Sequence, residues 1–238
     1  AEDGIRDVER SRGLGDVYKR QILVVDPTTA GVSGDMLLSA LLDILGSSDI
    51  LRELAESVKS CVPWVEELKL ELVEVRKLGF KAKKLVVEVH EKKGERRGKE
   101  LINAVKCTAE RMSLHSWGKE VAVRAVEILL EAEAKLHGEA IDEVHLHEAG
   151  EADTVVDVVG VAAVMERLGF EEAEIYVLPL AVGGGRVRIS HGVVPSPAPA
   201  TLEIIRVGGL FMEGGPVDGE LTTPTGCLLY TSDAADEL

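Results

Sequence analysis

The chain has 238 residues, of which 42 are acidic and 27 are basic, so its formal net charge is −15. Such an acidic chain lacks the basic face that non-specific binding to nucleic acid requires, and we expect no nucleic-acid partner. It contains no apolar run of the roughly 18 to 20 residues that a membrane span needs, so we expect no membrane partner either.

The two ends of the chain do not read like protein sequence. Residues 11–21 (SRGLGDVYKRQ) and 227–237 (CLLYTSDAADE) look like one-frame translations of the two ends of a transposon-based sequencing adapter. Translated adapter sequence has no bearing on a fold. We therefore predict a non-native tail at 1–21, a native domain over 22–226 whose gene continues beyond Gly226, and a second non-native tail at 227–238. The alternative is an ordinary tail at the start and a natural C-terminus.

Outside these tails the chain has two cysteines, Cys61 and Cys107. Two cysteines without a spacing pattern make neither a disulfide framework nor a zinc ribbon. We therefore expect a reducing compartment, with the cytoplasm as the default. No secretory signal is left once the first tail is removed.

The first element is a short apolar run, Ile22–Val25, which reads as a buried strand and ends at Asp26. It leads into the turn Gly31–Asp35, after which a helix follows with Ser33 as its N-cap. Backbone N–H groups at such a helix start face outward with the positive end of the dipole, which favours a phosphate. Asp26 and Asp35 flank the turn and favour a cation, or a cation carried by a phosphate. In the structural alternative, the glycines only make a tight turn and Asp35 caps the helix.

The middle of the chain is predicted to be helical with one hairpin. Alternating apolar and polar residues predict strands over 68–76 and 81–90, joined by a turn at 78–80. Helices are predicted at 36–45, 49–60, 101–112 and 116–137, and residues 91–99 are predicted to form a charged loop. The single histidines His90, His115 and His137 lie at element ends and are interpreted as structural.

The segment from His145 to Asp157 carries the clearest chemical signal. If it is extended at first, His145 and His147 project to the same side because strand side chains alternate, and Glu148 follows directly. If a helix begins after the next glycine, Asp153 and Asp157 stack on one face. Imidazole and carboxylate groups are ligands for nickel, zinc, iron and manganese. The alternative is two partly exposed histidines, and aspartates that cap a helix.

The last part of the domain combines strands, glycines and prolines. A buried helix is predicted at 155–168, with strands at 174–178 and 180–191. Gly183–Gly185 let a backbone approach a ligand or another strand closely. After His191 a run of prolines fixes an extended segment and starts a short helix near residue 200. The hydroxyl-rich loop 219–226 can hold phosphate or metal-bound water, although Thr-Pro turns are commonly only turns.

These elements together predict an α+β protein with a mixed β-sheet covered by helices. The length is enough for one good-sized core or two small domains.

Four stretches of this sequence resemble one family. DPTTAGVSGDM, VHLHEAGEADTVVDVVG, SHGVVPSPAPAT and GELTTPTG occur here in the order found in the LarC family of nickel insertion proteins, and the resemblance covers essentially all of residues 22–226. It implies an enzyme of the metal chelatase or lyase type that inserts nickel into pyridinium bisthiocarboxylic acid mononucleotide, forming nickel–sulfur bonds and a nickel–carbon bond. It also implies CTP hydrolysis with manganese or magnesium. The product of the family is the nickel-pincer nucleotide cofactor of lactate racemase and its relatives.

The chain departs from the family pattern in two places. Family members continue into a C-terminal domain to which the CTP site is attributed, and we expect this chain to be inactive without it. Many members also carry a histidine-rich run after the second hairpin strand, where this chain reads His90–Arg97 (HEKKGERR). A nickel-storage role is therefore not expected for that run.

The chemistry of nickel insertion assigns roles to the candidate residues. Nickel that is to be handed on requires a few imidazole and carboxylate ligands with open positions, and not a closed thiolate cage. We predict nickel ligands at His145, His147, Glu148 and Asp26. Removing a proton from the substrate ring needs a general base, for which Asp153, Asp157 and His191 are open alternatives. Donors for the substrate and its phosphate are predicted at Gly31, Ser33, Gly34, Asp35, Gly184, Gly185, Thr222, Thr223 and Thr225.

Two rival functions use the same residues. A metal-dependent hydrolase would use the histidines and carboxylates to activate water. A non-catalytic nickel carrier or nucleotide-binding module would bind its ligand without chemistry. A small-molecule partner is expected in each case, and a homo-oligomer stays open.

Overall fold

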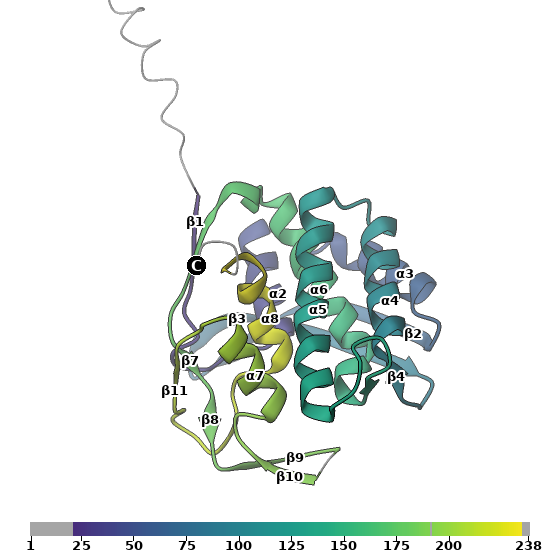
Figure 1. Cartoon of the computed structure of the whole chain (residues 1–238). Coiled ribbons are helices and arrows are strands. Elements are labelled where there is room, and N and C mark those ends of the chain that lie inside the picture. Colours follow the sequence, from purple (N-terminus) through teal and green to yellow (C-terminus); the bar gives the residue numbers. More distant parts are fainter. Residues whose placement is uncertain (1–20, 191, 235–238) are drawn as a thin grey trace, which may run out of the picture.

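The computed structural model describes residues 21–190 and 192–234. In this part of the chain seven α-helices, α2 to α8, share one apolar core, and short paired strands lie along its edges (Figure 1). The predicted α+β class is confirmed.

Helix α6 (Ala152–Arg167) is the centre of the core. Its apolar residues lie nearly all round the helix, and every residue from Thr154 to Met165 is buried. Five helices pack against it: α2 (Gly34–Leu45), α3 (Ile50–Cys61), α4 (Gly98–Arg111), α5 (Ser116–His137) and α8 (Pro224–Ala234). The predicted buried helix is confirmed and begins at Ala152. Within the described residues, no helix is both long and apolar enough to cross a membrane.

The predicted hairpin is the longest stranded feature. Strands β2 (Val65–Lys77) and β3 (Phe80–Glu91) pair antiparallel around a turn at Leu78–Gly79. Alternation places leucines of β2 opposite apolar residues of β3 on one face, as in the pair Leu72–Leu85. Helices α2 and α3 cover that face, so the hairpin is held by burial of one side.

The other strands are short and pair two by two. The parallel pairs are β1 (Ile22–Val25) with β6 (Glu174–Val177), and β7 (Leu180–Ala181) with β11 (Met212–Glu213). The antiparallel pairs are β4 (Arg96–Arg97) with β5 (His145–Leu146), β8 (Gly183–Gly184) with β12 (Gly219–Glu220), and β9 (Arg186–Ile189) with β10 (Gly192–Pro195). The described strands thus include both parallel and antiparallel pairs, arranged as separate two-stranded sheets.

The predicted strand 180–191 is divided because its glycines bend the backbone. Gly183 has a φ of 82°, a left-handed conformation that favours glycine. A Cβ atom at Gly183 would lie 1.9 Å from the carbonyl oxygen of Gly219. This glycine therefore allows another segment of the same chain to approach, one of the two roles considered from the sequence.

Cys61 and Cys107 form a disulfide that joins the end of α3 to α4, with their Cα atoms 5.6 Å apart. The prediction from cysteine usage was wrong for this pair. The two residues are 46 positions apart in sequence, and only the packing of α3 against α4 brings them together. The pairing removes the reason that was given for a reducing compartment.

The described chain ends in two packed helices. Helix α7 (Pro199–Val207) begins with the predicted proline at its first turn, and α8 (Pro224–Ala234) packs against α5 and α7. Residues Cys227–Tyr230 of α8 are buried in the core. The prediction of adapter-derived tails includes these residues and stays a prediction.

Candidate functional site

Three aspartates gather where helices α2 and α6 begin. Asp35 lies in the first turn of α2, and Asp153 lies in the first turn of α6. Asp157 follows one turn after Asp153, so the pair shares one face of α6 as predicted. We call Asp35, Asp153 and Asp157 the acidic centre.

Asp157 is the buried member of the acidic centre. Its residue surface is 6% exposed, and its Oδ1 atom is buried without a hydrogen-bond partner among the described residues. The carboxyl group presses against the start of α2, since a Cβ atom at Gly34 would lie 2.2 Å from Oδ2 of Asp157. Glycine at position 34 is therefore required by this contact.

The start of α8 closes the acidic centre. Thr225 accepts a hydrogen bond from the amide of Gly34 at 3.4 Å, and its hydroxyl lies 3.2 Å from that of Thr223. The Ser33 hydroxyl donates to the Asp35 carboxylate. Ser33 is the N-cap of α2 by position, as predicted, but its hydroxyl binds a side chain instead of the helix backbone.

Two carboxyl groups of the acidic centre, those of Asp157 and Asp153, have raised pKa values. Burial raises the pKa of Asp157 well above its ordinary value, the charges of Asp153 and Asp35 act in the same direction, and a hydrogen bond with Thr225 opposes them. Asp153 is exposed on one side, yet the protein packed around its carboxyl raises its pKa too. The Thr154 amide, which donates to Asp153 at 2.7 Å, opposes this rise, and the charge of Glu91 adds to it.

The predicted nickel ligands lie in different surroundings. His145 Nδ1 lies 3.2 Å from Glu139 Oε2, and hydrogen bonds with His145 lower the pKa of Glu139. His147 is exposed and lines a separate cavity. Asp26 is exposed and accepts hydrogen bonds from the hydroxyl and amide of Thr28, at 2.5 Å and 3.1 Å, which lower its pKa.

These residues do not form one metal cluster in the described part of the chain, where no three histidine, cysteine or acidic side chains are placed to hold a metal ion. Glu148 lies in the short helix η1 (Glu148–Gly150), and His191 lies outside the described residues. The nickel-ligand set therefore stays a prediction.

Most of the predicted phosphate donors have partners within the chain. The amide of Gly31 donates to the carbonyl of Pro27 at 3.0 Å, and a Cβ atom at Gly31 would lie 2.1 Å from the carbonyl oxygen of Leu221. The buried Thr222 hydroxyl donates to the carbonyl of Ala181 at 2.7 Å. These contacts hold the loops together. They explain the presence of Gly31 and Thr222 without any need for a bound ligand.

Two further predicted donors are close to a carboxylate. A Cβ atom at Gly184 would lie 3.6 Å from Asp218 Oδ1, and one at Gly185 would lie 3.2 Å from the same oxygen. The negative charge of Asp218 disfavours a phosphate there.

A polar cavity of about 430 Å³ lies between the end of β3 and the start of α6. We call it the polar cavity, and its lining residues are Glu91, Lys92, Lys93, Gly94, Glu95, Arg96, His147, Gly150, Glu151 and Ser190. Glu91 joins it to the acidic centre, because its Oε2 accepts the amide hydrogen of Ala152 at 3.2 Å. The sequence predicted only a charged loop over residues 91–99 and did not indicate a cavity there.

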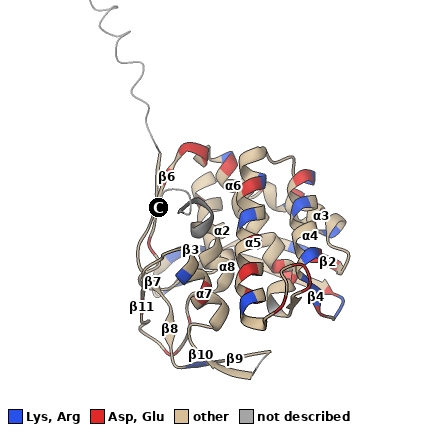
Figure 2. Cartoon of the chain, viewed as in Figure 1, with Lys and Arg blue, Asp and Glu red and all other residues tan. Residues whose placement is uncertain are grey.

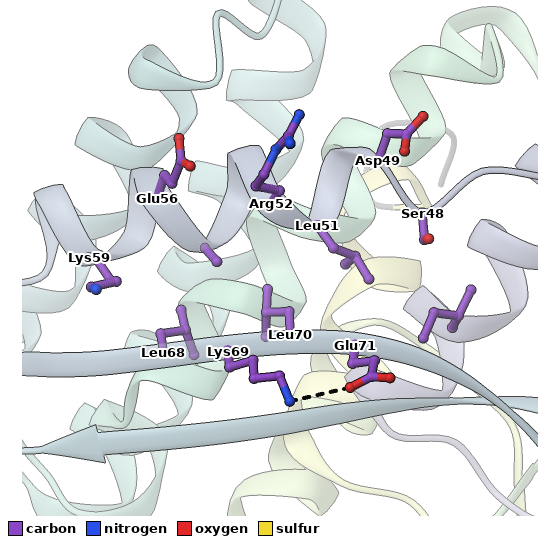
Figure 3. Close-up of a pocket in the computed structure, with 12 residues that line it drawn as sticks. Ser48, Asp49, Leu51, Arg52, Glu56, Lys59, Leu68, Lys69, Leu70 and Glu71 are labelled. Carbon is purple, nitrogen blue, oxygen red and sulfur yellow. Dashed lines mark ion pairs between the residues drawn. The ribbon is translucent and has the colours of Figure 1, made fainter.

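A second cavity lies elsewhere. It has a volume of about 470 Å³, lies between α3 and β2, and contains none of the predicted site residues. Figure 3 shows that Arg52 and Glu56 point away from β2. The apolar wall of the cavity is formed by Leu51, Leu68 and Leu70. This groove offers no group for metal or proton chemistry beyond exposed charges at its rim.

Carboxyl groups with raised pKa values beside a polar cavity of small-molecule size are typical of an enzyme that acts on a small polar molecule. The comparison with known proteins gives the family. The family model of nickel insertion proteins matches residues 23–237, and the chain belongs to that family.

Relatives of this family cover most of the chain. A nickel insertion protein by name from Methanopyrus kandleri is 41% identical over 89% of this chain and 51% of its own length. One from Methanothermobacter thermautotrophicus is 37% identical over 89% of the chain and 50% of its length. The pyridinium-3,5-bisthiocarboxylic acid mononucleotide nickel insertion protein of Staphylococcus saprophyticus is 33% identical over 83% of the chain and 47% of its length.

The chain thus spans about half the length of the curated relatives that it matches. No solved structure gives a significant match.

Proposed function

We propose that this chain is part of an enzyme that inserts nickel into pyridinium-3,5-bisthiocarboxylic acid mononucleotide. The observation that supports this most directly is the acidic centre, which lies next to the polar cavity and carries two aspartates with raised pKa values. Forming a nickel–carbon bond at a pyridinium ring releases the ring proton, so the reaction needs a group that accepts a proton near neutral pH.

Asp153 is the proton acceptor in this proposal. It is exposed on one side, so a ring carbon of the substrate can reach it, whereas Asp157 is buried behind it. A raised pKa makes the Asp153 carboxylate a stronger base than an ordinary aspartate. Burial of the Asp153 carboxyl is the main cause of this raised pKa, and the charges of Glu91 and Asp35 act in the same direction. His191 is the alternative base.

Nickel is a substrate of this reaction, and the proposal keeps His145, His147, Glu148 and Asp26 as its ligands. Imidazole and carboxylate groups hold nickel without the thiolate cage that would prevent its release. The cysteines do not compete for it, because Cys61 and Cys107 are bonded to each other and Cys227 is buried.

The requirement for CTP with manganese or magnesium is also part of the proposal and rests on the family resemblance. In this proposal the rest of the full-length protein binds CTP, and the reaction takes place in the cytoplasm.

The test uses full-length protein with nickel, CTP, magnesium and the thiolated mononucleotide, and follows the metallated product by mass and absorbance. Asp153→Asn is expected to lower product formation by roughly 100-fold or more, the usual contribution of a general base. Asp43→Asn, on the exposed side of α2, is the matched control and should leave the rate unchanged. A wild-type rate in Asp153→Asn would remove this residue as the base. Hydrolysis of a simple phosphoester with no metallated product would favour the metal-dependent hydrolase.

A further inference from the structure

Three cations lie within five residues at the end of β3. Lys92, Lys93 and Arg96 line the polar cavity, although the chain as a whole has a net charge of −15. Figure 2 shows this blue segment of loop beside β4. Within residues 92–96 only Glu95 is acidic, so this segment carries a net charge of +2, and a positive segment on an acidic protein attracts an anion.

Arg96 is the buried cation of this group. Its residue surface is 9% exposed, and its guanidinium carbon lies 5.0 Å from the ring centre of Trp64. The guanidinium donates to the carbonyl oxygens of Lys92 and, at 3.4 Å, of Glu95. Both partners are neutral carbonyl groups, no described carboxylate forms an ion pair with the guanidinium, and its Nε atom is buried without a partner.

A buried cation that no carboxylate contacts directly destabilises the folded protein. An anionic ligand beside Arg96 would supply the missing charge, because a guanidinium binds phosphate and carboxylate groups through several N–H donors. The structure therefore points to a ligand that carries negative charge into the polar cavity.

The acidic side chains of the polar cavity limit the kind of anion. Glu91 is turned to the N-terminus of α6, where it accepts the amide hydrogen of Ala152 at 3.2 Å. Glu95 and Glu151 line the same cavity. With Glu91 engaged at the helix start, the three cations face two acidic side chains, so one positive charge is left over and a single phosphate fits the charge balance better than a triphosphate does.

We propose that the polar cavity binds the phosphate group of a pyridine mononucleotide, with Lys92, Lys93 and Arg96 as its cationic contacts. This inference rests on the proposed function and names the part of the site that holds one end of its substrate. A volume of about 430 Å³ is in the range of small-molecule sites. The cavity wall includes Glu151, two residues before Asp153, so the other end of the ligand can reach the acidic centre.

Calorimetry on the chain with nicotinate mononucleotide as probe tests this inference, and nicotinate riboside serves as the probe without phosphate. The variant Lys92→Gln/Lys93→Gln is expected to bind the mononucleotide at least tenfold more weakly and the riboside with unchanged affinity. Lys77→Gln/Lys106→Gln removes the same charge from exposed positions outside the polar cavity. This control should bind both probes like the wild type.

Arg96→Lys keeps the charge but loses the fork of N–H donors, and should also weaken binding of the mononucleotide. If Arg96→Lys does not fold, the Lys92→Gln/Lys93→Gln variant alone decides. No binding of the mononucleotide by the wild type, or an equal loss in the lysine variant and its control, would overturn the inference.

The outcomes separate this inference from the proposed function. One outcome is phosphate-dependent binding that is lost in Lys92→Gln/Lys93→Gln, together with no nickel insertion by the full-length wild type. This outcome would keep the cavity assignment and remove the proposed function. If full-length Lys92→Gln/Lys93→Gln inserts nickel with the wild-type KM for the mononucleotide, the cavity assignment is overturned and the proposed function is kept.

Discussion

At the scale of single residues, Asp157 links stability to proton binding. Gly34, Thr225 and the two other aspartates surround its carboxyl group, and Oδ1 is left without a hydrogen bond among the described residues. A buried carboxylate in such a position destabilises the fold, while a protonated carboxyl does so less. Asp157 therefore retains its proton to a higher pH than surface aspartates do.

This gives the first prediction, the pH dependence of the Asp157→Asn variant. The pKa of Asp157 is raised in the folded state above its ordinary value of 3.8, so the stability from this group is complete below that pH and is lost as pH rises toward the raised pKa. A tenfold difference in proton affinity between folded and unfolded states is worth about 1.4 kcal/mol. Urea unfolding from about pH 4 to about pH 8 should show the wild type losing stability relative to Asp157→Asn. A constant difference between the two proteins over that range would contradict the prediction.

The residues of the site differ in how far the sequence could predict them. The spacing of Asp153 and Asp157 was enough to place both on one face of a helix, since only local geometry is involved. Arg96 could not be recognised, because a basic residue in a charged loop usually faces solvent, and its burial depends on Trp64 and the start of α6. The approach of Asp35 to the same point depends on how α2 packs against α6.

At the scale of elements, long periodic segments and the four-residue strands β1 and β6 were predicted, whereas strands of only two residues were not. The hairpin β2–β3 and the helix α6 follow from apolar periodicity over many residues. Strands of two residues, such as β4 and β5, exist only because distant segments meet. Helix α4 begins at Gly98, inside the predicted loop, because the Glu100 side chain accepts the amide hydrogen of Arg97 at 2.8 Å and caps the helix.

The second prediction concerns the link between α3 and α4. The Cys61–Cys107 disulfide closes a loop between the two helices and restricts the unfolded chain. Reduction is expected to lower the free energy of unfolding by about 2 to 4 kcal/mol. Thermal unfolding with and without a reducing agent measures this, and Cys61→Ser/Cys107→Ser should be insensitive to the reducing agent. Two reactive thiols in the native, unreduced protein, beyond buried Cys227, would contradict it.

At the scale of the whole molecule, one edge carries apolar side chains that the described chain does not cover. Strands β1 and β6 run along this edge, and the helices lie on one side of them only (Figure 1). Ile22 is 61% exposed, Val24 59% and Tyr176 54%. Parallel strands are usually covered on both faces, and contiguous exposed apolar surface promotes association.

The third prediction is that this edge makes the chain self-associate. Val24→Lys/Tyr176→Lys places charge on neighbouring positions of the paired strands, where Val24 lies opposite Tyr176, and should shift the chain toward the monomer because burying two ammonium groups opposes association. Sedimentation velocity over a range of concentrations measures the shift. Leu78→Lys, at the hairpin tip where the side chain is 99% exposed, tests whether charge alone has this effect. Since Leu78 lies on a different surface, its variant should associate like the wild type, and an equal shift in both variants would show that the edge is not the contact.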